Sequence, residues 1–164
     1  GMPKGYLMTK TEHENFKLEF EWRWPEGTEI VKGKEPNSGV LLRIASDAIG
    51  FMPKCVEAQV KSGSAGDIWA FRGAKLGKQE ERWIEIKDHE FLADFTGIKR
   101  MEGAEKPVGE WNRYEITCMN EDVELRINGK LVNKASGLEV LAGPIGFQSE
   151  GAEIHFRKIV VTNL

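Results

Sequence analysis

The sequence contains little cysteine, no long hydrophobic run and no block of like charge. Its two cysteines and three histidines do not occur in spacings typical of a metal site. The 23 basic and 26 acidic residues are interspersed, which argues against a nucleic-acid partner. Apolar stretches fall far short of the roughly 20 residues that cross a bilayer, and no signal peptide is evident. We therefore expect no nucleic-acid partner and no membrane-spanning segment, and no motif in the sequence indicates a bound cofactor.

Cys55 and Cys118 are the only cysteines. A disulfide between neighbouring strands and two free thiols in the core remain alternatives, and the lack of a paired spacing favours the free thiols. No repeat, linker or low-complexity segment divides the chain. Because 164 residues suffice for one hydrophobic core, residues 1–164 are predicted to form a single domain.

A helical hydrophobic period is also missing, whereas a two-residue period recurs. In residues 16–24, apolar and charged residues alternate, and the same pattern returns in 39–44, 112–117, 122–128 and 143–149. Asn128-Gly129 predicts a type I′ hairpin, and a change of phase near Arg157 and Lys158 predicts a bulge. The sequence therefore predicts an all-β, two-sheet antiparallel sandwich of the jelly-roll type. Residues 73–110 form a less regular excursion that we expect to rim a binding surface.

Polar side chains occupy the outward positions of several predicted strands. In the stretch KCVEAQV, residues 54–60, Glu57 and Gln59 alternate with the apolar core positions. Such residues are often merely solvated, because one face of each sheet meets water. However, Arg43 and Gln148 take the same outward phase in two other segments. If these strands are neighbours, the four side chains converge in a patch suited to sugar hydroxyls.

Five tryptophans is a high number for this length. Trp22 and Trp24 follow the core phase of their strand and are expected to pack inside. Trp69 borders a turn, where an indole either covers the core or stacks on a sugar ring. Both alternatives remain open for Trp69.

A set of short motifs runs in order from about Gly5 to the end of the chain. The motifs are Asn37-Ser38-Gly39 with Arg43, Glu57-x-Gln59, Trp111-Asn112, and Gln148-x-x-Gly151 leading into Phe156-Arg157. As a set they resemble the 3-keto-disaccharide hydrolase family, formerly called domain of unknown function 1080. The resemblance implies a concanavalin A-like jelly roll, a carbohydrate ligand and an exported, extracytoplasmic bacterial protein.

The chain departs from this family pattern in two places. Family members usually begin with a further segment that carries an Asn-Gly turn and a tryptophan strand. Its absence indicates either a trimmed chain or a member that has lost one edge of the fold. Glu150 stands where the family usually has histidine, so ligand preference is expected to differ if this position touches the ligand.

The resemblance also suggests a reaction. Related sandwich glucanases carry E-x-D-x-E on one strand, whereas Glu57, Gln59 and Lys61 leave a single carboxylate, so two-carboxylate hydrolysis is not expected. A ketone at C3 of the sugar would acidify the C2 proton and make one base sufficient. We expect Glu57 to be that base and Arg43 to stabilise the enolate, and a divalent metal could replace Arg43.

Substrate binding is expected from Asn37, Gln59, Asp67, Trp69 and Gln148. The competing hypothesis is a carbohydrate-binding module that uses the same face without turnover. A third hypothesis is a structural domain whose polar faces are only solvated. The sugar, its linkage and the oligomeric state are left open.

Overall fold

The computed structural model describes residues 4–45 and 51–164. Within these residues the regular secondary structure consists of strands alone. The strands are β1 (Gly5–Met8), β2 (Phe16–Arg23), β3 (Gly39–Leu42), β4 (Cys55–Gln59), β5 (Ile68–Phe71), β6 (Trp83–His89), β7 (Ala93–Ile98), β8 (Asn112–Met119), β9 (Asp122–Ile127), β10 (Lys130–Ala135), β11 (Gly146–Ser149) and β12 (His155–Asn163). Within these described ranges, no helix is long and apolar enough to span a membrane.

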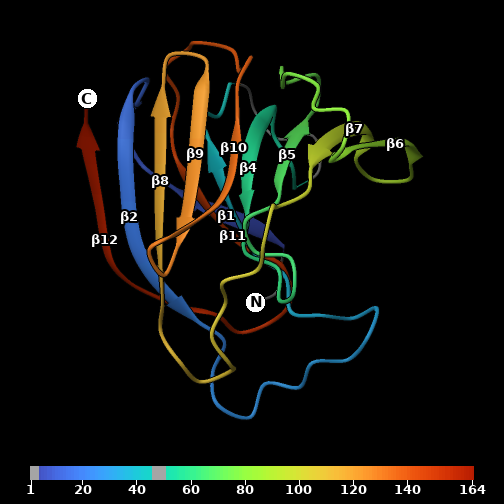
Figure 1. The fold of residues 1–164 in the computed structure, drawn as a ribbon, viewed down its shortest axis with the longest axis vertical. Helices are drawn as coiled ribbons and strands as arrows, with labels where there is room; N and C mark the ends of the chain where they lie inside the picture. The colour runs from blue at the N-terminus through green and yellow to red at the C-terminus, as the bar shows by residue number, and fades with distance from the viewer. Residues whose placement is uncertain (1–3, 46–50) are drawn as a thin grey trace.

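The strands form two antiparallel sheets (Figure 1). One sheet has seven strands in the order β1-β11-β3-β4-β5-β7-β6, and the other has five in the order β10-β9-β8-β2-β12. The predicted all-β sandwich is confirmed. Strand β4, which carries Glu57 and Gln59, is the central strand of the seven-stranded sheet.

The core lies between the sheets and is built by the alternation that the sequence shows. In β2, Phe16, Leu18, Phe20 and Trp22 are buried, while the residues between them are partly exposed. Trp22 packs against Tyr114 of β8, with ring centroids 5.4 Å apart. Apolar burial of this kind is the main stabilising contribution to a sandwich. Trp24 also belongs to this core, so both tryptophans pack inside as expected.

Two local predictions are confirmed. Asn128 and Gly129 connect β9 to β10 and have φ of 52° and 83°. A type I′ turn requires positive φ at both positions, so this is the predicted hairpin turn. The register of β12 against β2 shifts between Arg157 and Val160, and Lys158 has φ of 53°. This is the predicted bulge in the C-terminal strand.

Both cysteines are free and buried, as expected. Burial raises the pKa of Cys118 to about 12, and burial together with the charge of Glu57 raises the pKa of Cys55 well above its usual value. Neither sulfur is therefore a thiolate near neutral pH, which a cysteine nucleophile would have to be.

The alternation in β3 breaks at its C-terminal end. Arg43 has φ of 50°, in the left-handed region, and the strand ends at Leu42. A single left-handed residue reverses which face the next side chains take. Ile44 therefore leaves the core face shared by Val40 and Leu42, and the expectation that all three point the same way is wrong for Ile44.

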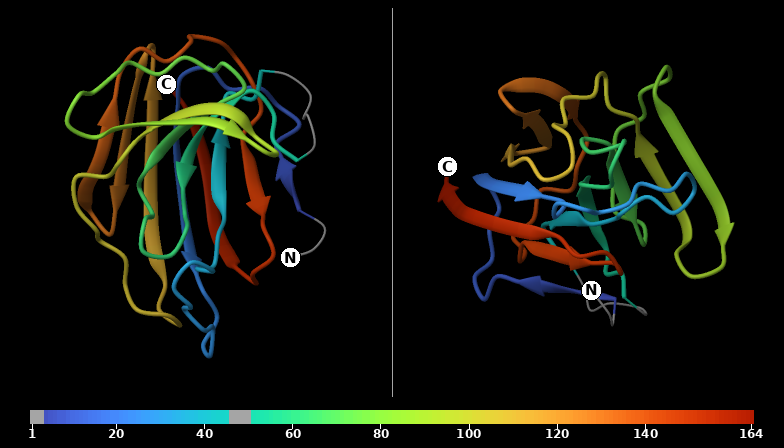
Figure 2. Two further views of the ribbon diagram at one scale, coloured as in Figure 1. Left: turned by 90° about the vertical axis from the view of Figure 1, so that its right-hand side faces the viewer. Right: turned by 90° about the horizontal axis from the view of Figure 1, so that it is seen from below.

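Ile44 instead joins a second apolar cluster that is separate from the main core. Its buried members are Leu41, Ile44, Met52, Cys55 and Phe71. Leu41 lies opposite Glu57 in the pairing of β3 with β4, so the cluster occupies the outer face of the seven-stranded sheet. The β6–β7 hairpin, part of the predicted excursion, passes across this face (Figure 2). The outer face is therefore partly covered rather than open to water.

Candidate functional site

An open pocket with a volume of about 360 Å³ lies on the outer face of the seven-stranded sheet. Its lining is Asn37, Met52, Glu57, Gln59, Lys61, Ser64, Trp69, Phe71, Ile86, His89, Leu92, Phe95 and Glu150. The lining thus combines acids and amides with aromatic and aliphatic side chains. A concave, mainly apolar wall with a few polar groups is typical of a small-ligand site.

Glu57 is the most deeply buried acid of this pocket. It lies opposite Leu41 on one neighbouring strand and Trp69 on the other, and it is only 2% exposed. Removal from water raises the pKa of Glu57 well above its usual value, and the nearby charge of Glu150 raises it further. The alternative that Glu57 is simply solvated is therefore wrong.

Gly39 makes room for this carboxyl group. A Cβ atom at Gly39 would lie 1.9 Å from Oε1 of Glu57 and 2.6 Å from Oε1 of Gln148. Real Cβ contacts are essentially never this short, so any side chain at position 39 would displace both groups. The glycine of the Asn37-Ser38-Gly39 motif thus leaves the space that the ends of the Glu57 and Gln148 side chains occupy.

The amides of Gln59 and Gln148 are placed differently. Oε1 of Gln59 accepts hydrogen bonds from the backbone N–H groups of Val60 and Lys61, both at 3.0 Å. This fixes the amide and leaves its Nε2 as a donor at the pocket wall. Gln148 is buried beside Glu57, and its Nε2 contacts the sulfur of Met52 at 3.9 Å.

Glu150 brings a second carboxylate to the pocket, although it was not among the residues predicted to form the site. It follows β11, and its Oε2 accepts a hydrogen bond from Nδ2 of Asn37. Burial raises the pKa of Glu150, whereas Lys4, the Asn37 hydrogen bond and Lys61 oppose the rise. One signal was available: Glu150 follows Gln148 by two residues, which places both on one face of an extended segment.

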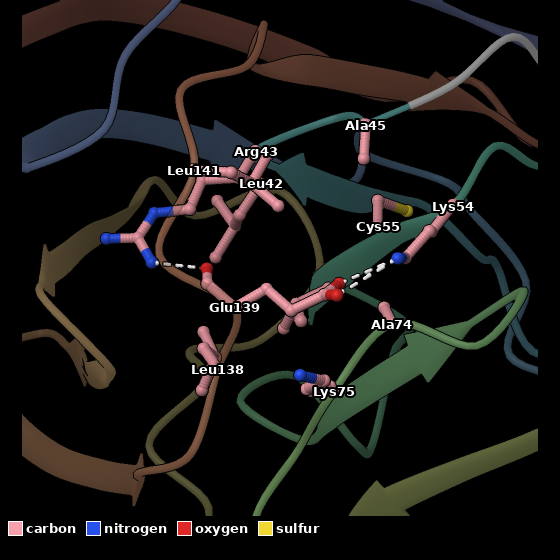
Figure 3. A pocket seen from close by; sticks show the side chains of 11 residues that line it. Leu42, Arg43, Ala45, Lys54, Cys55, Ala74, Lys75, Leu138, Glu139 and Leu141 are labelled. Atoms are coloured by element: carbon pink, nitrogen blue, oxygen red, sulfur yellow. Dashed lines mark hydrogen bonds and ion pairs between the residues drawn. The ribbon is translucent and has the colours of Figure 1, made fainter.

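Arg43 does not belong to this site, and the expectation that it faces Glu57 is wrong. Its guanidinium group donates to the carbonyl oxygens of Glu14, Asn120 and Glu139 at 2.8, 2.8 and 2.9 Å. Figure 3 shows this group turned to the main chain of Glu139, beside a cavity of only about 20 Å³. The left-handed φ of Arg43 is the physical reason, because it turns the side chain away from the outer face. The Arg43 side chain thus links three main-chain segments by hydrogen bonds. In this orientation it cannot stabilise an enolate formed in the pocket beside Glu57.

Asp67, which was expected to bind substrate, also lies outside the site. Its Oδ1 accepts a hydrogen bond from the backbone N–H of Arg100 at 2.8 Å, and Asp67 is not part of the pocket lining. Burial raises the pKa of Asp67, and the hydrogen bond from Arg100 partly offsets the rise. Asp67 therefore anchors the segment after β7 instead of binding substrate.

Trp69 forms one wall of the pocket and is partly exposed. Its ring lies over Gly97, where a Cβ atom would come within 2.3 Å of Cε3. Phe95 supports the indole edge-on, with ring centroids 5.5 Å apart. The indole is thus held in a fixed orientation, as a stacking platform for a sugar ring requires.

If Trp69 stacks on a sugar ring, as the sequence allows, replacing it with alanine is expected to weaken that binding about fivefold, because a stacked ring contributes on the order of 1 kcal/mol. Isothermal titration would measure the change. Trp111→Ala is the matched control, since Trp111 stacks with Arg23 and Arg157 on other strands and does not line the pocket. Equal losses in the two variants would contradict a stacking role for Trp69.

Several solved structures share this fold. Two proteins of Parabacteroides distasonis, each named "putative glycosyl hydrolase", are 21% and 16% identical to this chain, both with a TM-score of 0.65. The first alignment covers 100% of this chain and 85% of the other, and the second covers 97% and 76%. The carbohydrate binding module CBM66 of Bacillus subtilis is 13% identical over 95% of this chain and 80% of its own, with a TM-score of 0.60. At these identities the likeness shows the fold.

The sequence comparison identifies the family. No curated protein sequence matches the chain. The family described as 3-keto-alpha-glucoside-1,2-lyase-like domain matches residues 1–162. This match spans almost the whole chain. It includes all of the strands, apart from the last residue of β12. The chain therefore belongs to the family of 3-keto-alpha-glucoside-1,2-lyase-like domains.

Proposed function

We propose that this protein cleaves glycosides whose sugar carries a ketone at C3, by eliminating the C1 substituent in the pocket around Glu57. The observation that carries the proposal is the pair of buried or half-buried carboxyl groups, Glu57 and Glu150, in one open pocket with Trp69. Membership of the lyase-like family supports the reaction class. The carbohydrate-binding relative CBM66 supports carbohydrate as the ligand.

The ketone determines which bonds change. A carboxylate removes the proton from C2, and the electron pair of the C2–H bond enters an enolate with the C3 ketone. The enolate then expels the C1 oxygen substituent with its bonding pair, leaving a C1–C2 double bond. The expelled oxygen takes up one proton, and water subsequently adds to the double bond. Atoms and charge balance without an oxidant or reductant.

The enolate oxygen needs hydrogen-bond donors. Arg43 does not line the pocket, and its guanidinium group already donates to the carbonyl oxygens of other segments. Nε2 of Gln59 is a fixed donor at the pocket wall, since its carbonyl oxygen is held by two backbone N–H groups. Preorganised donors of this kind stabilise developing negative charge. We therefore assign Gln59 the electrophilic role that the sequence suggested for Arg43.

Turnover of a 3-keto glucoside is the direct test. We expect the protein to release alcohol from methyl 3-keto-glucoside, followed by NMR, but not from methyl glucoside, whose C2 proton is not acidified. A chelator is expected to leave the rate unchanged, because the proposed reaction uses no metal. The double variant Glu57→Gln/Glu150→Gln should lose at least about 100-fold in kcat/KM.

Glu124→Gln is the matched control, because Glu124 pairs with Arg126 on the other sheet and lies outside this pocket. Binding of the keto sugar without release of alcohol would replace the proposal with a carbohydrate-binding module. Release that is unaffected by the double substitution would place the reaction elsewhere. No binding and no release would leave only the structural hypothesis.

A further inference from the structure

Two buried acceptor oxygens come together at the base of the pocket. Oε1 of Glu57 and Oε1 of Gln148 both lie within 2.6 Å of the point that a Cβ of Gly39 would occupy. Among residues 4–45 and 51–164, neither oxygen has a hydrogen-bond donor. Glu57 is 2% exposed and Gln148 is 3% exposed, so bulk water does not satisfy them.

Such an arrangement is unfavourable if both oxygens carry only lone pairs. A buried acceptor without a donor costs about 1–3 kcal/mol, and an unpaired buried carboxylate costs more. The N–H end of the Gln148 amide contacts Met52 instead of Glu57. A protonated carboxyl group has one O–H donor, and a single hydrogen bond from Glu57 to Gln148 would satisfy both oxygens.

We propose that Glu57 is held as a neutral carboxylic acid whose proton is shared with Gln148, and that Glu150 carries the ionised carboxylate of the pocket. The two environments support this division. Burial and the charge of Glu150 raise the pKa of Glu57, whereas Lys4, Asn37 and Lys61 oppose the rise in the pKa of Glu150. Carboxyl pairs in unequal surroundings commonly divide acid and base roles in this way.

The division assigns catalytic roles, and this step rests on the proposed function. Glu150 removes the C2 proton. Neutral Glu57 turns its single O–H group from Gln148 to the C3 oxygen and, beside Nε2 of Gln59, donates a hydrogen bond as negative charge develops there. The proton taken by Glu150 passes to the expelled C1 oxygen, so both groups return to their starting states. Glu57 is thus the donor and not the base, the reverse of the role expected from the sequence.

Other titratable groups around Glu57 also contribute to the pH dependence of stability, and their contributions must be distinguished from that of Glu57. They are Cys55 and Lys61 on or beside β4, His89 on β6, Glu150 after β11, and Tyr114 across the core. Burial raises the pKa of Tyr114 well above its usual value, and Lys61 is paired with Glu35 at 3.3 Å. Comparison with the Glu57→Gln variant at each pH removes their contributions.

Thermal unfolding of the Glu57→Gln variant tests the protonation state without substrate. Wild-type Glu57 ionises in the unfolded chain above about pH 4.3 but stays protonated in the folded chain up to its raised pKa. The Glu57 contribution to wild-type stability therefore falls as pH rises across that window, and the glutamine variant lacks this contribution. We expect the Tm advantage of the variant to grow with pH from about 4.3 and then to level off.

A Tm difference that is constant with pH, or that shrinks as pH rises, would overturn the proposal. A shrinking difference would mean that the Gln148 amide is reversed and donates its N–H to an ionised Glu57, and a constant difference would mean that folding does not change the pKa of Glu57. NMR of ¹³C-carboxyl-labelled glutamate supplies a second readout. At pH 7 we expect one carboxyl resonance in the protonated range, absent in Glu57→Gln and retained in Glu124→Gln.

Kinetics on methyl 3-keto-glucoside separates the two roles. Glu150→Gln removes the base and is expected to lower kcat/KM by about 100- to 10,000-fold at every pH. Glu57→Gln keeps an N–H donor, so it is expected to lose about tenfold and to lack the decline at alkaline pH. A larger loss in Glu57→Gln than in Glu150→Gln would refute the assignment while leaving the proposed function intact. An unaffected rate in both variants would refute the proposed function itself.

Discussion

Replacing Gly39 with alanine is expected to lower kcat/KM on a 3-keto glucoside by about tenfold or more while leaving the sandwich folded. The new Cβ would lie 1.9 Å from Oε1 of Glu57, so the carboxyl group must move. A displacement of about 1 Å at a reacting centre can cost that much in rate. The backbone of Gly39 does not have positive φ, so the substitution adds no backbone strain. Steady-state kinetics with circular dichroism would measure both effects.

Gly5→Ala is the matched control, because Gly5 lies in β1 of the same sheet and no atom lies within 4 Å of the point that its Cβ would occupy. This variant should retain wild-type activity. Normal turnover in Gly39→Ala would contradict a role for Glu57 in the reaction. Loss of the strand signal in Gly39→Ala alone would show a folding requirement instead.

Replacing Arg43 with methionine is expected to destabilise the fold strongly and to leave the chemistry of the folded fraction unchanged. Arg43 is 4% exposed, and its guanidinium group satisfies three backbone carbonyls in segments far apart in the sequence. Methionine fills similar volume but donates no hydrogen bond. Leaving buried acceptors unsatisfied costs about 1–3 kcal/mol each, so we expect about 3 kcal/mol in total after partial hydration. That corresponds to a drop in Tm of about 6–12 °C.

Arg126→Met provides the comparison, since the Arg126 side chain is 40% exposed and pairs with Glu124 across a solvated surface. Exposed pairs contribute about 0–1 kcal/mol, so its Tm should change little. Thermal denaturation and kcat/KM per folded molecule would be measured on both variants. A loss of more than about tenfold in kcat/KM of folded Arg43→Met would indicate that Arg43 stabilises the enolate after all, against its position in the structure.

The sequence predicts the sandwich because strands such as β2, β8 and β9 bury one face each, and alternation of apolar and polar residues directly reports such burial. The apolar set of β2 and the Asn128-Gly129 hairpin are confirmed for this reason. The outward phase of Glu57 and Gln59 is also confirmed, since β4 has regular backbone geometry. What these residues do chemically stays a prediction.

The failures have local physical causes. Arg43 was assigned to the outer face by extending an alternation that ends one residue earlier, and no residue type at position 43 announces a left-handed backbone. Glu150 was missed because β11 lies next to β3, a neighbour distant in the sequence. Strand order cannot be read from local sequence pattern. The spacing of Gln148 and Glu150 indicated a shared face, but not that this face lies beside Glu57.

The order of strands also determines how firmly each part of the pocket is held. Glu57 is carried by the middle strand, whose backbone amides are paired on both sides. Ile86 and His89 belong to β6, the outermost strand of the same sheet. Outer strands open locally at much lower free energy than central ones. We therefore expect the β6 wall of the pocket to give way more readily than the Glu57 side when a ligand enters.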